Sequence, residues 1–154
     1  MSASSRRRAR RAAGAARASA TGIARIHRVA RLVARGAPPE EVLRAAHEEL
    51  TGLLELRDAR FETPPYPREL PTIARTGAVT GVAERRCSGR DLELPRDGAA
   101  LEVLARGHGV GRFVLVPTPG KGASLEQLVV AVAISDQVGA ALVPPRHAEP
   151  WRTR

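Results

Sequence analysis

Apolar residues are densest between residues 101 and 143. Residues 101–105 and 110–116 predict two strands of a hairpin, joined at the turn signal of Gly107, His108 and Gly109. The run 113–116 is apolar on both faces, which is typical of a central strand covered on both sides. Ser124 and Gln127 then predict a capping box. It opens a largely buried helix over 124–142.

Upstream, the same reasoning predicts two more helices and a strand. Residues 21–35 place isoleucines and valines on one face and arginines mostly on the other, with Thr21 as the N-cap and Gly36 as the end. Pro38 and Pro39 open a helix that runs to about residue 54. Period-two alternation over 56–62 predicts a strand. Short strands are expected at Ile73, at Val79, over 82–87 and over 91–94.

These elements predict an α+β domain. We expect an antiparallel sheet of about five or six strands, with the helices near 40–54 and 124–142 on one face. The organisation follows as a disordered basic arm (1–20), an amphipathic basic helix (21–36), the domain (37–143) and a C-terminal tail (144–154) containing Trp151. The stripe of Ile23, Ile26, Val29 and Val33 has no obvious place in so small a domain, which predicts a homodimer through helices.

Charge separates the N-terminal region from the rest. Residues 1–35 hold ten arginines and no acid, whereas the whole chain has a net charge of +9, so residues 36–154 carry −1 (9 minus 10). Residues 1–20 lack large apolar side chains and cannot offset the chain entropy of folding, which predicts disorder. The arm either contacts nucleic acid or an acidic surface, or is merely a solvated tail of a GC-rich coding sequence.

Few residues indicate chemistry. One cysteine, Cys87, excludes an internal disulfide framework, and it is expected to be a small strand hydrophobe. The four histidines, at 27, 47, 108 and 147, lack metal-ligand spacing, and His47 is expected at the surface. We therefore predict no catalytic residues, no metal site and no cofactor. No stretch approaches 18 consecutive apolar residues and no secretory h-region follows the arginines, which predicts a cytoplasmic protein without a membrane span.

Two glycine-containing segments invite a phosphate-binding interpretation. Gly107, Gly109 and Gly111 have the wrong spacing for a dinucleotide fingerprint and precede a strand, so we interpret them as turn and close packing. The loop 119–122 holds the only lysine, Lys121, and precedes a helix N-terminus. It is either an anion site or a connector, since Leu115 stands at the first glycine position of a P-loop and Gly122 at its Ser/Thr position.

The segments LTGLLELRDARFE and GRFVLVPTPGKGASLEQLVVAVAISDQVGAAL, with the middle of the chain, resemble a GAF-type sensory domain. More narrowly, residues 38–143 resemble the GAF-like cytoplasmic portion of bacterial proteins with a KdpD-like four-helix membrane region, whose place residues 1–35 take here. The resemblance implies a non-catalytic sensory or regulatory module of bacterial signal transduction, acting through a ligand or a signalling protein partner. The alternative is a nucleic-acid-binding protein that uses the arginine-rich arm and helix.

Overall fold

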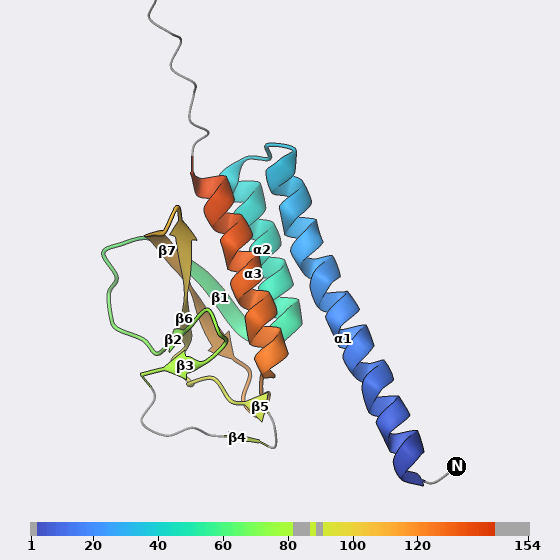
Figure 1. The fold of residues 1–154 in the computed structure, drawn as a ribbon. Helices are drawn as coiled ribbons and strands as arrows, with labels where there is room; N and C mark the ends of the chain where they lie inside the picture. The colour runs from blue at the N-terminus through green and yellow to red at the C-terminus, as the bar shows by residue number, and fades with distance from the viewer. Residues whose placement is uncertain (1–2, 82–86, 89–90, 144–154) are drawn as a thin grey trace, which may run out of the picture.

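The structure, a computed structural model, describes residues 3–81, 87–88 (backbone only) and 91–143. The elements follow in the order α1 (Ala3–Ala34), α2 (Pro39–Leu54), β1 (Leu56–Glu62), β2 (Thr72–Ile73), β3 (Val79–Thr80), β4 (Cys87–Ser88), β5 (Asp91–Leu92), β6 (Ala99–Ala105), β7 (His108–Pro117) and α3 (Leu125–Leu142). The expected α+β class is confirmed. Figure 1 shows α2 and α3 on one face of the sheet and α1 packed on these two helices.

The main sheet has five strands in the order β1-β7-β6-β2-β3. β7 is an interior strand between β1 and β6, antiparallel to both, and its residues 111–115 are all buried, as the doubly apolar run 113–116 predicted. The expectation of a wholly antiparallel sheet is wrong, because β2 pairs with β6 in parallel. β4 and β5 form a separate antiparallel pair, so the strand expected over 91–94 is shorter and outside the main sheet. Much of the strand expected over 82–87 and the whole C-terminal tail lie outside the described residues.

The hairpin between β6 and β7 is tighter than the sequence suggested. Its turn consists of Arg106 and Gly107, which both have positive φ, at 52° and 79°. Two consecutive left-handed residues match the right-handed twist of the flanking strands. His108 and Gly109 therefore belong to β7 rather than to the turn.

The core lies between the sheet and the helices. Phe61 of β1 is opposite Phe113 of β7, which is opposite Leu101 of β6, and the two phenyl rings meet edge to face with centroids 5.3 Å apart. The ring of Phe61 lies over Gly111, where a Cβ would be 2.3 Å from its Cζ. This confirms close packing as the role of Gly111. From α2, the expected residues Val42, Ala46, Leu50 and Leu53 are all buried.

Helix α1 differs most from expectation. Thr21 is not its N-cap, because the helix begins at Ala3 and residues 3–20, expected to be disordered, are helical. Alanine and arginine are among the best helix formers, so this segment extends α1 without an apolar stripe. The end is as predicted: Gly36, with φ 72°, closes a Schellman motif in which the amide of Ala37 donates to the carbonyl of Leu32.

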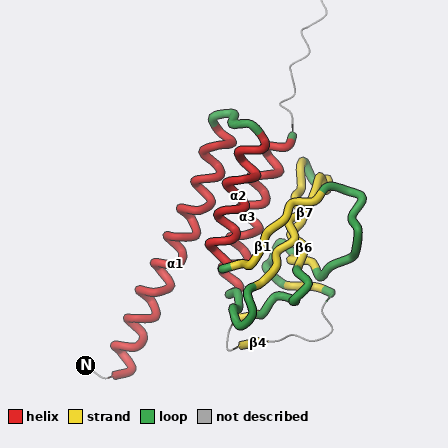
Figure 2. Tube along the Cα trace, turned by 180° about the vertical axis from the view of Figure 1, so that it is seen from behind, coloured by secondary structure: helices red, strands yellow, loops and turns green. Residues whose placement is uncertain are grey.

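The apolar stripe of α1 finds a place inside its own chain. Val29 is fully buried, and Ile26 and Val33 are partly buried against the core. Only Ile23 stays exposed, at 56%. The premise that this stripe lacks a partner is therefore wrong. Figure 2 shows from behind how the N-terminal half of α1 then runs on beyond the domain.

Candidate functional site

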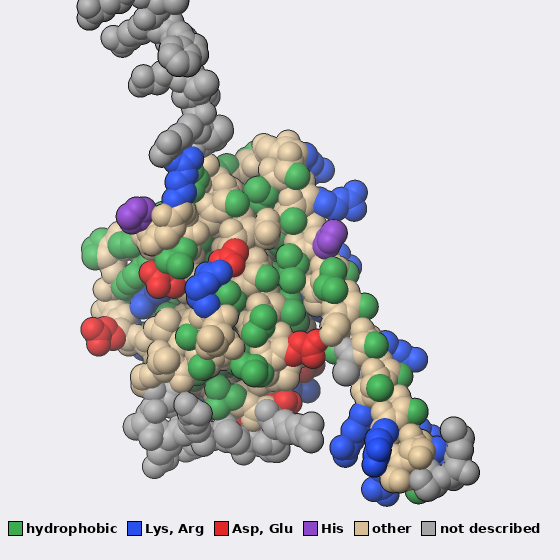
Figure 3. Space-filling view, viewed as in Figure 1, with side chains coloured by type: hydrophobic (Ala, Val, Ile, Leu, Met, Phe, Trp, Pro, Cys, Tyr) green, Lys and Arg blue, Asp and Glu red, His purple; other side chains and the backbone are tan. Residues whose placement is uncertain are grey.

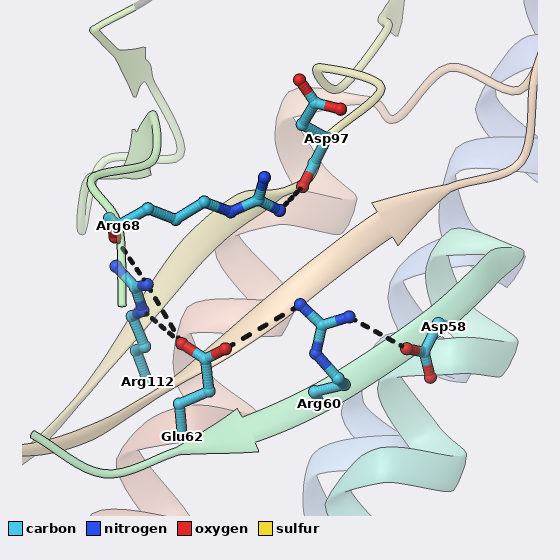
Figure 4. Close-up of polar contacts among 6 residues, drawn as sticks. All are labelled: Asp58, Arg60, Glu62, Arg68, Asp97 and Arg112. Atoms are coloured by element: carbon cyan, nitrogen blue, oxygen red, sulfur yellow. Dashed lines mark hydrogen bonds and ion pairs between the residues drawn. The ribbon is translucent and has the colours of Figure 1, made fainter. Parts of the chain in front are cut away.

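Charged side chains line the outer face of the sheet, the face turned away from the helices. Glu62 of β1 is directly opposite Arg112 of β7, and Arg112 Nη2 lies 3.0 Å from Glu62 Oε2. Arg60 lies 3.8 Å from both the Asp58 and the Glu62 carboxylates. Figure 4 shows that these alternating charges form one chain across the two strands.

Arg112 fastens the proline-rich loop 63–71 over this face. Although it is an arginine, it is only 6% exposed. Its Nη2 donates to the carbonyl of Arg68 at 2.8 Å, its Nε donates to Glu62, and its guanidinium carbon lies 4.2 Å from the centre of the Tyr66 ring. Arg68 in turn donates to the carbonyl of Asp97. Because most of these groups are satisfied within the chain, this cluster anchors the loop.

Tyr66 is partly exposed at the rim of the same cluster. Partial burial raises the pKa of its phenol, and the carboxylates of Glu102 and Glu62 add to the rise, while Arg112 opposes it. The phenol therefore remains protonated at neutral pH and keeps its neutral ring against the guanidinium.

The segment between β7 and α3 is the loop for which the sequence left an anion site open. Thr118 to Lys121 form a turn in which the amide of Lys121 donates to the carbonyl of Thr118, with Pro119 and Gly120 (φ 79°) at its centre. Thr118 Oγ1 donates to the carbonyl of Glu55 at 2.7 Å, and Lys121 Nζ lies 3.6 Å from Glu55 Oε2. The loop is thus tied to the end of α2.

Two amides at the N-terminus of α3 already have side-chain partners. The expected capping box is confirmed, since Ser124 Oγ accepts from the amide of Gln127 and Gln127 Oε1 accepts from the amide of Ser124. Gln127 Nε2 donates further to the carbonyl of Leu53. These two amides are therefore not available to bind an anion. An anion site in this loop would have to lie on the side of the loop that faces away from the N-terminus of α3.

On that other side the loop borders a cleft of about 680 Å³. Its lining includes Arg57 and Pro117, so the cleft lies at the end of the sheet where β1 begins and β7 ends. Basic side chains reach it from three segments: Arg57 at the start of β1, Arg96 after β5, and Lys121 in the loop. Glu93 is the one acid among its lining residues. No sequence motif or spacing indicates that Arg57 and Arg96 share a site with Lys121. The fold brings these three residues, which are distant in sequence, to the same cleft.

The other residues singled out in the sequence are scattered. His27 and His108 are exposed. His47 is exposed as expected, and its Nδ1 donates to the carbonyl of Ala59 at 2.7 Å. Among the described residues, no three His, Cys, Asp or Glu side chains gather as a metal site would require. The side chain of Cys87, together with His147 and Trp151, lies outside the described residues.

The arginine-rich arm, residues 3–20 of α1, is the most basic feature of the structure. Figure 3 shows its blue side chains gathered on the helix where it projects from the domain. At 100° per residue, its six arginines cover about half of the circumference, and the opposite side is lined by alanines. The arm meets the domain near Ser19, whose hydroxyl donates to the Glu126 carboxylate.

Helix α3 is, within the described part of the chain, the one helix long and apolar enough to cross a membrane. A core helix passes the same test, and here α3 packs against β6, α1 and α2. Neither a protein-family model, nor a curated protein, nor a solved structure matches the chain. The GAF-type resemblance therefore stays a prediction.

Proposed function

We propose that the protein is a non-catalytic, GAF-like regulatory module of bacterial signal transduction that acts in the cytoplasm. The observation that carries the proposal is the continuity of α1. Its C-terminal half packs on the domain, with Val29 fully buried, and its N-terminal half projects from the domain as part of the same helix. A change inside the domain can therefore reach a partner of the arm without an intervening linker.

The contact between α1 and α2 gives this connection its specificity. Glu49 of α2 is 7% exposed and accepts hydrogen bonds from Arg25 and Arg28 of α1, each at 2.9 Å. Directional charge-assisted bonds fix the rotation of one helix against the other more sharply than apolar contacts do. Any ligand or protein that shifts α2 would shift α1 with it.

The experiment is a thermal-shift screen of the full chain against the small-molecule fraction of a bacterial extract, followed by hydrogen exchange on each compound that stabilises the protein. We expect a stabilising compound to change amide exchange along α1 while remaining chemically unaltered by mass spectrometry. Glu49→Gln serves as the matched variant, in which binding persists but the response of the arm is reduced. Conversion of the compound, or a response confined to its own contacts, contradicts the proposal.

A second candidate is nucleic-acid binding by the arm, favoured by the six arginines that its projecting helix presents without any acid. If each arginine meets one phosphate, log K should fall against log salt with a slope of about −5 for duplex DNA. A variant with all six replaced by glutamine should lose both the binding and the slope. Salt-independent binding, or binding that survives in the variant, contradicts this candidate.

Homodimerisation through helices remains part of the proposal, with a changed interface. Because Val29 is buried in its own domain, a pairing surface on α1 has to use the exposed Ile23 instead. We expect Ile23→Glu to weaken a dimer in analytical ultracentrifugation, with the exposed neighbour substitution Ala24→Glu as the control. A protein that is monomeric at micromolar concentration excludes the dimer.

A further inference from the structure

We infer that the cleft between β1, the 93–96 segment and the 117–121 loop binds a small organic phosphate. This inference goes beyond the proposed function and does not depend on it. The cleft has a volume of about 680 Å³, within the range of about 300–1,000 Å³ usual for small-molecule sites.

The charged side chains that line the cleft are mostly basic. Three basic side chains and one acid line the cleft, and the two guanidiniums are not committed elsewhere: within the described residues, Arg57 and Arg96 have no ion-pair or hydrogen-bond partner. Arg112, by contrast, donates hydrogen bonds to Glu62 and to the carbonyl of Arg68. One guanidinium group can donate two parallel hydrogen bonds to a phosphate, and an ammonium group such as that of Lys121 adds a point charge. An anion would thus gain from both guanidiniums, and from Lys121 in exchange for its ion pair with Glu55.

The walls of the cleft are held in place by hydrogen bonds to neighbouring elements. One wall is tied to α2 through Thr118 and the Glu55 carbonyl. Beyond the loop, Ala123 and Leu92 exchange two backbone hydrogen bonds, at 2.8 and 2.9 Å, which join the loop to the β5 segment that leads into the other wall. Three prolines, Pro95, Pro117 and Pro119, restrict the lining backbone further.

The lining also offers contacts to the part of the ligand that is not phosphate. Beside the basic groups, the lining holds Leu94 and the prolines, which offer an apolar surface to an organic moiety. Glu93 is partly buried in the same wall and can accept a hydrogen bond from a hydroxyl or amine. An inorganic anion uses only the basic part, so the whole lining fits a phosphorylated organic compound better than a simple ion.

The test uses the full chain, with inorganic pyrophosphate as the probe, titrated by heteronuclear NMR at constant ionic strength. We expect amide shifts at Arg96, Thr118 and Lys121. Arg57→Gln and Arg96→Gln should each weaken binding about tenfold, the loss of one charge-assisted contact. Arg44→Gln, an exposed arginine of α2 away from the cleft, should leave the affinity unchanged. Circular dichroism melting of each variant checks that it folds.

Two further experiments are needed. One distinguishes a lipid phosphate from a soluble phosphate, and the other distinguishes the cleft from the arginine-rich arm as the binding site. Vesicles containing phosphatidylglycerol test whether the phosphate belongs to a lipid headgroup. If the vesicles capture the protein, if Arg57→Gln and Arg96→Gln abolish this capture, and if pyrophosphate does not bind, the inference of a soluble ligand is overturned. A variant with the six arm arginines replaced by glutamine should bind pyrophosphate normally. Loss of binding in that variant, or its persistence in the Arg57→Gln/Arg96→Gln double variant, overturns the inference whatever the outcome for the regulatory proposal.

Discussion

Gly139 sets the distance between α3 and the sheet. It is buried in the last turn of α3, facing β6, and an added Cβ would lie 2.0 Å from the carbonyl oxygen of Leu104 and 3.0 Å from its carbonyl carbon. Carbon and oxygen atoms that are not bonded approach to about 3.3 Å. Gly139→Ala therefore has to separate helix and strand by about 1 Å.

The expected cost follows from that displacement. A gap of about 0.5–1 Å removes a quarter to a half of the attraction between the separated atoms, and overpacked cores lose about 1–3 kcal/mol. We take the upper end, because the obstacle is backbone rather than a flexible side chain. Alanine returns about 1 kcal/mol through its higher helix propensity. The net loss is about 2 kcal/mol, which lowers the thermal midpoint by about 4–8 °C in a chain of this size.

Urea unfolding followed by circular dichroism at 222 nm measures this loss. The matched control is Gly14→Ala, the same substitution in the exposed part of α1, where nothing lies within 4 Å of the added Cβ. The control should gain helicity without losing stability. If Gly139→Ala also leaves the midpoint unchanged or raises it, then α3 does not approach the sheet as closely as we describe.

Three other results are expected. Glu49→Gln should destabilise the fold by about 1–3 kcal/mol in urea unfolding, because it leaves Arg25 partly buried without its counter-charge; a neutral effect would show that α1 is held by apolar contacts alone. The phenol of Tyr66, the only tyrosine, should ionise above its usual pKa of about 10 when absorbance is followed at 295 nm. The stability that the neutral phenol contributes to the folded state is therefore lost as pH rises through the raised pKa. Glu102→Gln should lower the midpoint of this titration, because the Glu102 carboxylate contributes to the rise. Deletion of residues 1–17 should change stability by about 0.5 kcal/mol or less, and a larger loss would mean that the arm packs on the domain.

Much of the fold was accessible from the sequence because it depends on strong local patterns. The bounds of β1, the pairing of the hairpin and the capping box of α3 each rest on periodicity or on side chains close in sequence. Residues 3–20 carry no apolar stripe that would indicate a helix, and only the helix propensity of their alanines and arginines favours one.

Other features depend on contacts distant in sequence and leave no local signal. β2 has two residues, too few for a pattern that distinguishes parallel from antiparallel pairing. Glu49 and Arg112 have the polarity of surface residues, and only their partners from α1, β1 and the 63–71 loop explain their burial. The basic cleft likewise combines three segments between residues 57 and 121, of which the sequence flagged only the last.

The position of β7 between β1 and the other strands also determines when the protein can fold during its synthesis. β1 pairs only with β7 in the main sheet, and β6 is joined to β1 only through it. Until residues 108–117 have been made, β1 and the helix before it have no sheet to join, and their apolar faces lack the cover that α3 later provides. The N-terminal half of the chain therefore stays open at the ribosome, exposed to chaperones and to other nascent chains, and the sheet closes late.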